Sequence, residues 1–117
     1  MNPLVYGLCQ QTVTVYRKQG ENITRKVVDT CYFSQTMGTP MEHYGKSMEK
    51  KFLLIIPGND TPLQPGDRVF AGVGPVEVDW QSFLPTTTPE LFTVAFAQPC
   101  YWENSVSHWE AGSERRL

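Results

Sequence analysis

The stretch QTVTVYRKQGENITRKVVDTCYF, residues 11–33, decides the fold class of this chain. In its first part, Val13 and Val15 alternate with more polar residues, which is the period of two of a half-buried strand. Its second part, from Thr24, is rich in β-branched and aromatic residues, which favour strands. The polar link between the two parts contains Gly20, so the stretch predicts an antiparallel hairpin.

The rest of the chain continues as short apolar runs separated by proline and glycine. The run KFLLII, residues 51–56, predicts a central strand covered on both faces. In residues 76–80, two valines and a tryptophan alternate with Glu77 and Asp79, which predicts a strand with one solvated face. Pro99 is expected to end the strand before it. The remaining strands are expected at residues 68–73, 91–98 and 106–110.

This spacing predicts an all-β fold: a small single-domain β-barrel or sandwich of about six to seven short antiparallel strands with long loops. The 117 residues suit one domain with one core. Within this domain, 1–117, residues 34–47 show no regular period and are expected to form a long loop. Residues 111–117 are expected to form a mostly polar C-terminal tail.

Composition and charge exclude several classes of function. The formal net charge of −2 provides no basic field for a polyanion, which disfavours nucleic-acid binding as the main activity. No apolar run approaches the roughly 18 residues of a membrane span, so we expect no membrane partner. The first ten residues lack the pattern of a secretory signal, and a protein kept in a cytoplasm is expected. The three cysteines are then expected to be reduced thiols.

Residues capable of catalysis or metal binding are scattered along the chain. A closed zinc site usually shows paired ligands two to four residues apart, and His43, His108 and the cysteines show no such pair. Cys31 and Cys100 are interpreted as small apolar fillers rather than nucleophiles. We therefore expect no catalytic residue, no metal and no cofactor, and a protein that is not an enzyme.

Aromatic and methionine side chains carry the stronger functional signal. Tyr101 and Trp102 lie in a turn-like segment, where aromatic residues are typical anchors of protein interfaces. Met37, Met41 and Tyr44 lie in the expected long loop, and flexible apolar side chains there can adapt to a partner. An assembly role fits these features better than catalysis does.

Four segments, in order along most of the chain, also match a known pattern. Residues 12–33 pair a Thr-Val-Thr-Val-Tyr strand with a strand that ends in an aromatic pair, and MEKKFLLIIP, residues 48–57, ends in Ile-Pro. LQPGDRVFAGV, residues 63–73, has a Gly-Asp turn before a strand closed by glycine, and SHWEAG, residues 107–112, follows near the end. Together they resemble the small head–tail connector proteins of tailed bacteriophages, the neck, head-completion or minor capsid proteins. The middle loops, residues 37–48 and 86–89, depart from that pattern.

The resemblance implies a structural protein of the virion. Such proteins form a homo-oligomeric ring in the neck, between the portal or adaptor proteins and the tail proteins, and assemble in the cytoplasm of the bacterial host. The ring extends the DNA channel and helps retain the genome. Packaged double-stranded DNA passes through the lumen without sequence-specific binding, which suits a mildly acidic chain.

The segment His108-Trp109-Glu110 has two interpretations. In one, Trp109 packs into the barrel while His108 and Glu110 share the opposite face and pair with neighbours. In the other, the three residues lie at a subunit contact, so they join the candidate interface residues. Two alternatives to a connector also stay open: a binding module that presents Tyr101 and Trp102 to a sugar or peptide, and a small hydrolase or metal enzyme that uses His108, Glu110 and Cys100.

Overall fold

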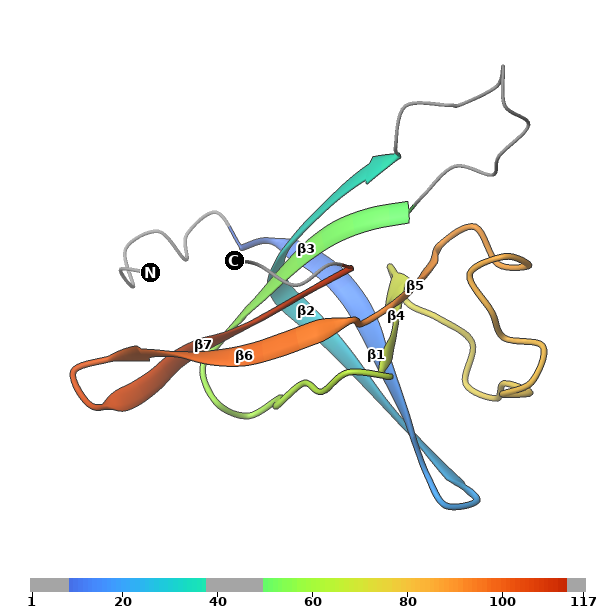
Figure 1. Ribbon diagram of the computed structural model, residues 1–117, viewed down its shortest axis with the longest axis horizontal. Coiled ribbons are helices and arrows are strands. Elements are labelled where there is room, and N and C mark those ends of the chain that lie inside the picture. Colours follow the sequence, from blue (N-terminus) through green and yellow to red (C-terminus); the bar gives the residue numbers. More distant parts are fainter. Residues whose placement is uncertain (1–8, 38–49, 114–117) are drawn as a thin grey trace.

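The computed structural model describes residues 9–37 and 50–113, and these form a curled all-β structure (Figure 1). The strands are β1 (Gln11–Gln19), β2 (Asn22–Met37), β3 (Lys50–Pro57), β4 (Arg68–Ala71), β5 (Leu91–Thr93), β6 (Phe96–Trp102) and β7 (Ser105–Gly112). They form one antiparallel sheet in the order β5-β4-β1-β2-β3-β7-β6, which curls into a half-barrel. The predicted all-β class, with six to seven antiparallel strands, is confirmed.

The long strand β2 joins the two halves of the sheet. Its first part, residues 22–31, pairs with β1, and its last part, residues 32–37, pairs with β3. The register with β1 shifts between Gln11 and Val13, where β2 has one residue more than β1. Such a bulge bends a strand and increases its twist, and here it lies next to the point where β2 changes partner.

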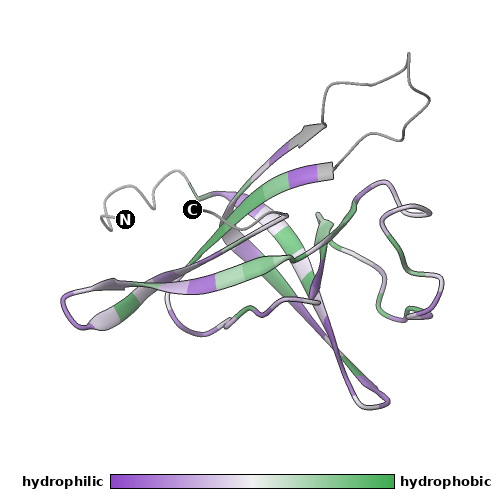
Figure 2. Cartoon of the chain, in the orientation of Figure 1, coloured by the Kyte–Doolittle hydropathy of each residue, from purple (hydrophilic) through white to green (hydrophobic). Residues whose placement is uncertain are grey.

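The concave side of the half-barrel holds the main core. Phe52, Leu54 and Ile56 of β3 lie in this core, together with buried residues of the flanking strands. Three rings meet at one end: Phe92 lies 5.3 Å from Phe33 and 5.4 Å from Phe52, between ring centroids. Figure 2 shows β3 as an apolar stretch in the middle of the sheet, which agrees with the prediction of a central strand.

The outer face of β1 is also buried, so the prediction of a half-buried strand is wrong. Thr14 and Tyr16, which point away from the main core, are both 0% exposed. Residues 72–90 cover them: Phe83 lies edge-on to Tyr16 with ring centroids 4.8 Å apart, and Val78 and Trp80 pack nearby. A second apolar cluster on this side of the sheet therefore gives the domain two cores.

Residues 76–80 form no strand, contrary to the prediction, and lie in the turns and bends of this covering segment. Val78 and Trp80 point toward the second cluster, whereas Glu77 and Asp79 are exposed. The alternation therefore holds for Val78 and Trp80 without strand pairing, whereas Val76, the first apolar residue of the pattern, is 77% exposed. Arg68 fixes the segment, since its Nη1 donates to Trp80 O and to Phe83 O, both at 2.6 Å.

Several predicted boundaries are also wrong. The strand expected at residues 91–98 is two strands, β5 and β6, and the strand expected at residues 68–73 ends at Ala71. Residues 34–37, assigned to the long loop 34–47, continue β2 and pair with β3. Residues 111–112, assigned to the C-terminal tail, belong to β7, and Ala111 is buried in the main core. Pro99 lies inside β6 rather than at the end of a strand, which the sheet tolerates because β6 is its last strand. The rest of both predicted irregular segments falls outside the described residues, apart from Ser113.

Two hairpins extend from the body of the half-barrel (Figure 1). In the β6–β7 hairpin, pairing of β7 with β3 runs only as far as His108, whereas pairing with β6 continues to Ser105. The turn at its tip places Glu103 at φ 51° and Asn104 at φ 70°, the pattern of a two-residue type I′ turn. In residues 9–37 and 50–113, no helix has the length and hydropathy needed to cross a membrane.

Candidate functional site on the β6–β7 hairpin

Three residues able to bind metal or move protons meet at the base of the β6–β7 hairpin. Cys100 of β6 lies directly opposite His108 of β7, and Glu110 follows two residues later on the same strand. Side chains two apart in a strand share a face, and a cross-strand neighbour lies on that face as well. One donor atom from each residue lies within 4.8 Å of the other two.

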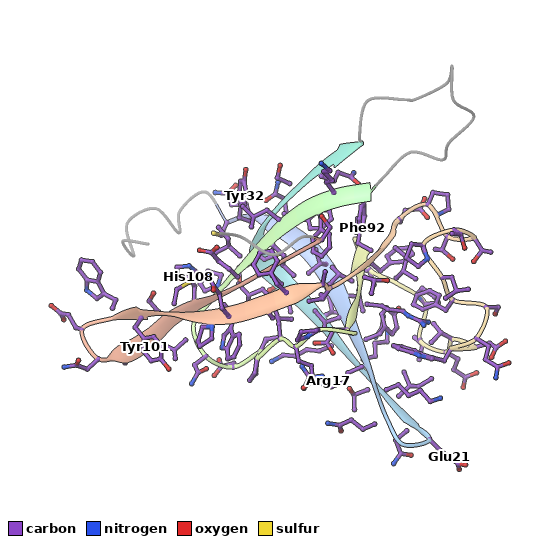
Figure 3. The ribbon with its side chains drawn as sticks, in the orientation of Figure 1. Arg17, Glu21, Tyr32, Phe92, Tyr101 and His108 are labelled. Carbon is purple, nitrogen blue, oxygen red and sulfur yellow. The ribbon has the colours of Figure 1, made fainter. Side chains whose placement is uncertain are left out.

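The contacts among the three residues converge on one carboxylate oxygen. His108 Nε2 lies 3.2 Å from Glu110 Oε2, and Cys100 Sγ lies 3.4 Å from the same oxygen. His108 is 0% exposed, whereas Cys100 and Glu110 are partly buried. Figure 3 shows His108 in the hairpin, between Tyr101 of β6 and the body of the sheet.

Ser107 contacts the same histidine from the other ring nitrogen. Its Oγ donates to Cys100 O at 3.2 Å and lies 3.1 Å from His108 Nδ1. Ser107 and Glu110 therefore each contact one ring nitrogen of His108, and together they hold the ring in one orientation.

These contacts differ from those that activate a cysteine nucleophile. In a Cys–His pair the thiol faces the imidazole, which withdraws its proton. Here Cys100 Sγ contacts the carboxylate of Glu110 instead. The interpretation of Cys100 as an apolar filler is nevertheless wrong, since the thiol lies in a polar cluster, while Cys31 is buried in the main core as predicted.

Trp109 points to the other side of β7. It packs against the main core, and its Nε1 donates to Asn59 Oδ1 at 2.9 Å. His108 and Glu110 lie together on the opposite face and contact each other. This matches the first interpretation of the segment, and its role at a subunit contact stays a prediction.

Tyr101 and Trp102 form an exposed aromatic tip next to this cluster. Tyr101 is 64% exposed and Trp102 is 46% exposed, although both are large and partly apolar. Ser105 Oγ donates to Trp102 O at 3.3 Å across the turn. Of the other predicted interface residues, Met41 and Tyr44 lie outside the described residues, as does His43, and Met37 ends β2.

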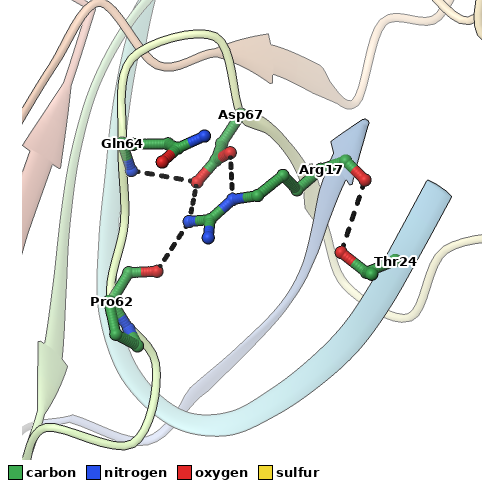
Figure 4. Close-up of polar contacts among 5 residues, drawn as sticks. All are labelled: Arg17, Thr24, Pro62, Gln64 and Asp67. Atoms are coloured by element: carbon green, nitrogen blue, oxygen red, sulfur yellow. Dashed lines mark hydrogen bonds and ion pairs between the residues drawn. The ribbon is translucent and has the colours of Figure 1, made fainter. Parts of the chain in front are cut away.

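A second polar cluster, which the sequence did not indicate, lies at the turn before β4 (Figure 4). Arg17 Nε and Nη2 donate to the two carboxylate oxygens of Asp67, each at 2.8 Å, and Nη2 also donates to Pro62 O. The Gly66-Asp67 pair was visible as a turn, but its ion-pair partner lies 50 residues away. A cavity of about 160 Å³ lies beside it, with Lys26 on its wall donating to Asp60 O at 2.8 Å. These polar groups bind one another, so the cluster supports the fold.

Comparison with family models, with curated proteins and with solved structures finds no match to this chain.

Proposed function

We propose that this chain is a structural protein of a tailed-phage virion, which forms a homo-oligomeric ring in the neck between portal or adaptor and tail. The ring would surround the DNA channel and help retain the packaged genome. The resemblance of four segments to head–tail connector proteins motivates the proposal. The exposed aromatic tip of the β6–β7 hairpin is the structural observation that carries it.

The tip has the properties of an interface anchor. Aromatic residues dominate interface energies when a partner buries them, and their exposure in a single chain costs hydrophobic free energy. A type I′ turn and the cross-strand pairs of β6 and β7 hold Tyr101 and Trp102 away from the body of the domain. A hairpin of this kind can reach a neighbouring subunit.

A closed ring needs two different surfaces on each subunit, one of which binds the other on the next copy. The aromatic tip supplies the first surface. Two further exposed apolar residues, Val73 at 67% and Val76 at 77%, lie in the segment that covers β1, on the far side of the half-barrel from the tip. This segment is a candidate for the second surface.

Cryo-electron microscopy of particles from the phage or prophage that encodes the chain tests the proposal. We expect a ring of copies around the DNA channel, with each aromatic tip buried against a neighbour. The double variant Tyr101→Ser and Trp102→Ser should keep the fold, since both residues are exposed, and yield particles that lose their DNA. The exposed substitution Glu21→Ser, on the β1–β2 turn, is the matched control. DNA-filled particles without the chain would overturn the proposal and favour the sugar- or peptide-binding module.

A further inference from the structure

We propose that Cys100, His108 and Glu110 bind one Zn²⁺ ion, which links β6 to β7 at the base of the β6–β7 hairpin. In the sequence only His108 and Glu110 lie close together, and Cys100 precedes His108 by eight residues. The antiparallel register brings Cys100 opposite His108 and places Glu110 on the same face. The proposal stands on this geometry and does not depend on ring assembly.

The distances between donor atoms suit a tetrahedral ion. Zinc binds thiolate sulfur at about 2.3 Å and imidazole nitrogen or carboxylate oxygen at about 2.0–2.2 Å, so two donors of one ion lie roughly 3.3–3.6 Å apart. His108 Nε2 and Glu110 Oε2 lie 3.2 Å apart, and Cys100 Sγ and Glu110 Oε2 lie 3.4 Å apart. The third pair of donors, from Cys100 and His108, lies within 4.8 Å, so side-chain rotations can bring all three donors around one ion.

The donor set selects among metals. A thiolate and an imidazole favour Zn²⁺ over Mg²⁺ or Ca²⁺, which prefer oxygen ligands. Three protein ligands leave one tetrahedral position for water or another protein group. Binding converts the Cys100 thiol to a thiolate, and the released proton goes to solvent.

Ser107 orients the histidine for this role. Its Oγ lies 3.1 Å from Nδ1, and Nε2 faces Glu110 Oε2 at 3.2 Å. A contact of this kind on the second ring nitrogen holds the ring orientation of a metal-binding histidine. Zn²⁺ bound at Nε2 would also meet Glu110 Oε2 and the Cys100 sulfur beside it.

The position of the site indicates what the ion would do. His108 is the last residue of β7 that pairs with β3, so the site lies where the hairpin leaves the sheet. The register of β6 with β7 shifts between Cys100 and Tyr101, next to the site. A metal link from β6 to β7 at this bulge would hold the aromatic tip in one orientation.

Metal titration of the full chain, purified without a polyhistidine tag and kept reduced, tests the proposal. We expect one Zn²⁺ per chain by mass spectrometry and a rise in melting temperature with added Zn²⁺. Co²⁺ as a probe should give the visible bands of a tetrahedral site and a thiolate charge-transfer band. Cys100→Ser should remove that band and weaken binding by roughly 100-fold, while Ser107→Ala should weaken it by about tenfold.

The matched control is Cys9→Ser, which removes a free thiol outside the cluster and should leave binding unchanged. Circular dichroism of the apo proteins separates lost binding from lost folding, and Cys100→Ser suits this because Cys100 is only partly buried. Failure of the folded wild-type chain to bind Zn²⁺ or Co²⁺ would overturn the proposal. So would a Co²⁺ thiolate band that survives in Cys100→Ser.

Discussion

Arg17 and Asp67 form a two-point ion pair that joins β1 to the turn before β4, with both N–O distances at 2.8 Å. Asp67 is 1% exposed, and its Oδ2 also accepts the backbone N–H of Gln64 at 3.0 Å. The pair raises the pKa of the Arg17 guanidinium, mainly through its hydrogen bond to Asp67. The stability of the fold depends on these donors, because without them the buried charge of Asp67 would have no compensation.

Asp67→Asn should destabilise the protein by about 2–3 kcal/mol, because it removes the charge that compensates Arg17 in a partly buried site. Urea unfolding measures the free energy difference. The control is Asp60→Asn, since Asp60 is exposed and its contact with Lys26 uses the backbone carbonyl. Equal stability of the two variants would contradict the proposed role of the ion pair.

Gly74→Ala should also destabilise the protein, by about 2 kcal/mol, through overpacking. A Cβ at this position would clash with Tyr16 Oη and with the ring of Phe70. Gly74 N–H also donates to Thr14 Oγ1 at 2.9 Å, so the backbone has little room to move away. Thermal unfolding compares this variant with Val73→Ala, whose side chain is 67% exposed and whose change should be within about 0.5 kcal/mol. If Gly74→Ala left the stability unchanged, residues 72–75 would not be packed tightly on β1.

Cys31 should make stability depend on alkaline pH. Burial raises the pKa of its thiol from 9.0 to about 11, so between these values the folded state keeps a proton that the unfolded chain loses. The stability that this provides is complete below pH 9 and declines as the pH rises to 11, by about 2 kcal/mol in all.

Urea unfolding at both ends of this pH window, under reducing conditions, compares wild type with Cys31→Ala. The variant lacks the thiol, so the stability difference between the two proteins should shrink at the upper pH. The other ionisable groups are the same in both proteins, so their contributions to the pH dependence of stability cancel in the comparison. A difference that is independent of pH would show that Cys31 does not cause the effect.

The double variant Glu103→Asn and Asn104→Gly should stabilise the hairpin by about 1 kcal/mol. Both positions have positive φ, 51° and 70°, which asparagine and glycine adopt at lower cost than glutamate and asparagine. Chemical denaturation measures the gain. The opposite effect is expected for Gly20→Ala in the β1–β2 turn. There φ is 63°, so the substitution should lower the free energy of unfolding by about 1 kcal/mol. A double variant less stable than wild type would contradict the assigned turn type.

The sequence predicted the strands wherever local patterning and packing agree. The period of two located β1, and the apolar run at residues 51–56 located β3 as a central strand. The prediction failed where a segment distant in the sequence determines whether a side chain is buried. Thr14 and Tyr16 carry hydroxyl groups and suggested a solvated face, but residues 72–90 cover them and accept or donate the required hydrogen bonds.

The candidate site shows the same limit. His108 and Glu110 share a face by simple alternation, so their contact was foreseeable from the sequence. Cys100 joins them only because β6 continues through Pro99 and pairs with β7 in a register that the sequence does not reveal. Arg17 and Asp67, 50 residues apart, lacked any local signal.

Pro99, in the middle of β6, has a consequence for self-association. β6 is the last strand of the sheet, and a last strand can add a strand from another molecule and so start uncontrolled aggregation. A proline has no N–H to offer such a strand, and the bulge after Cys100 further disturbs the ladder. Copies of this chain are thus discouraged from merging their sheets at β6, and contacts through side chains at the hairpin tip remain compatible with a limited, ordered assembly.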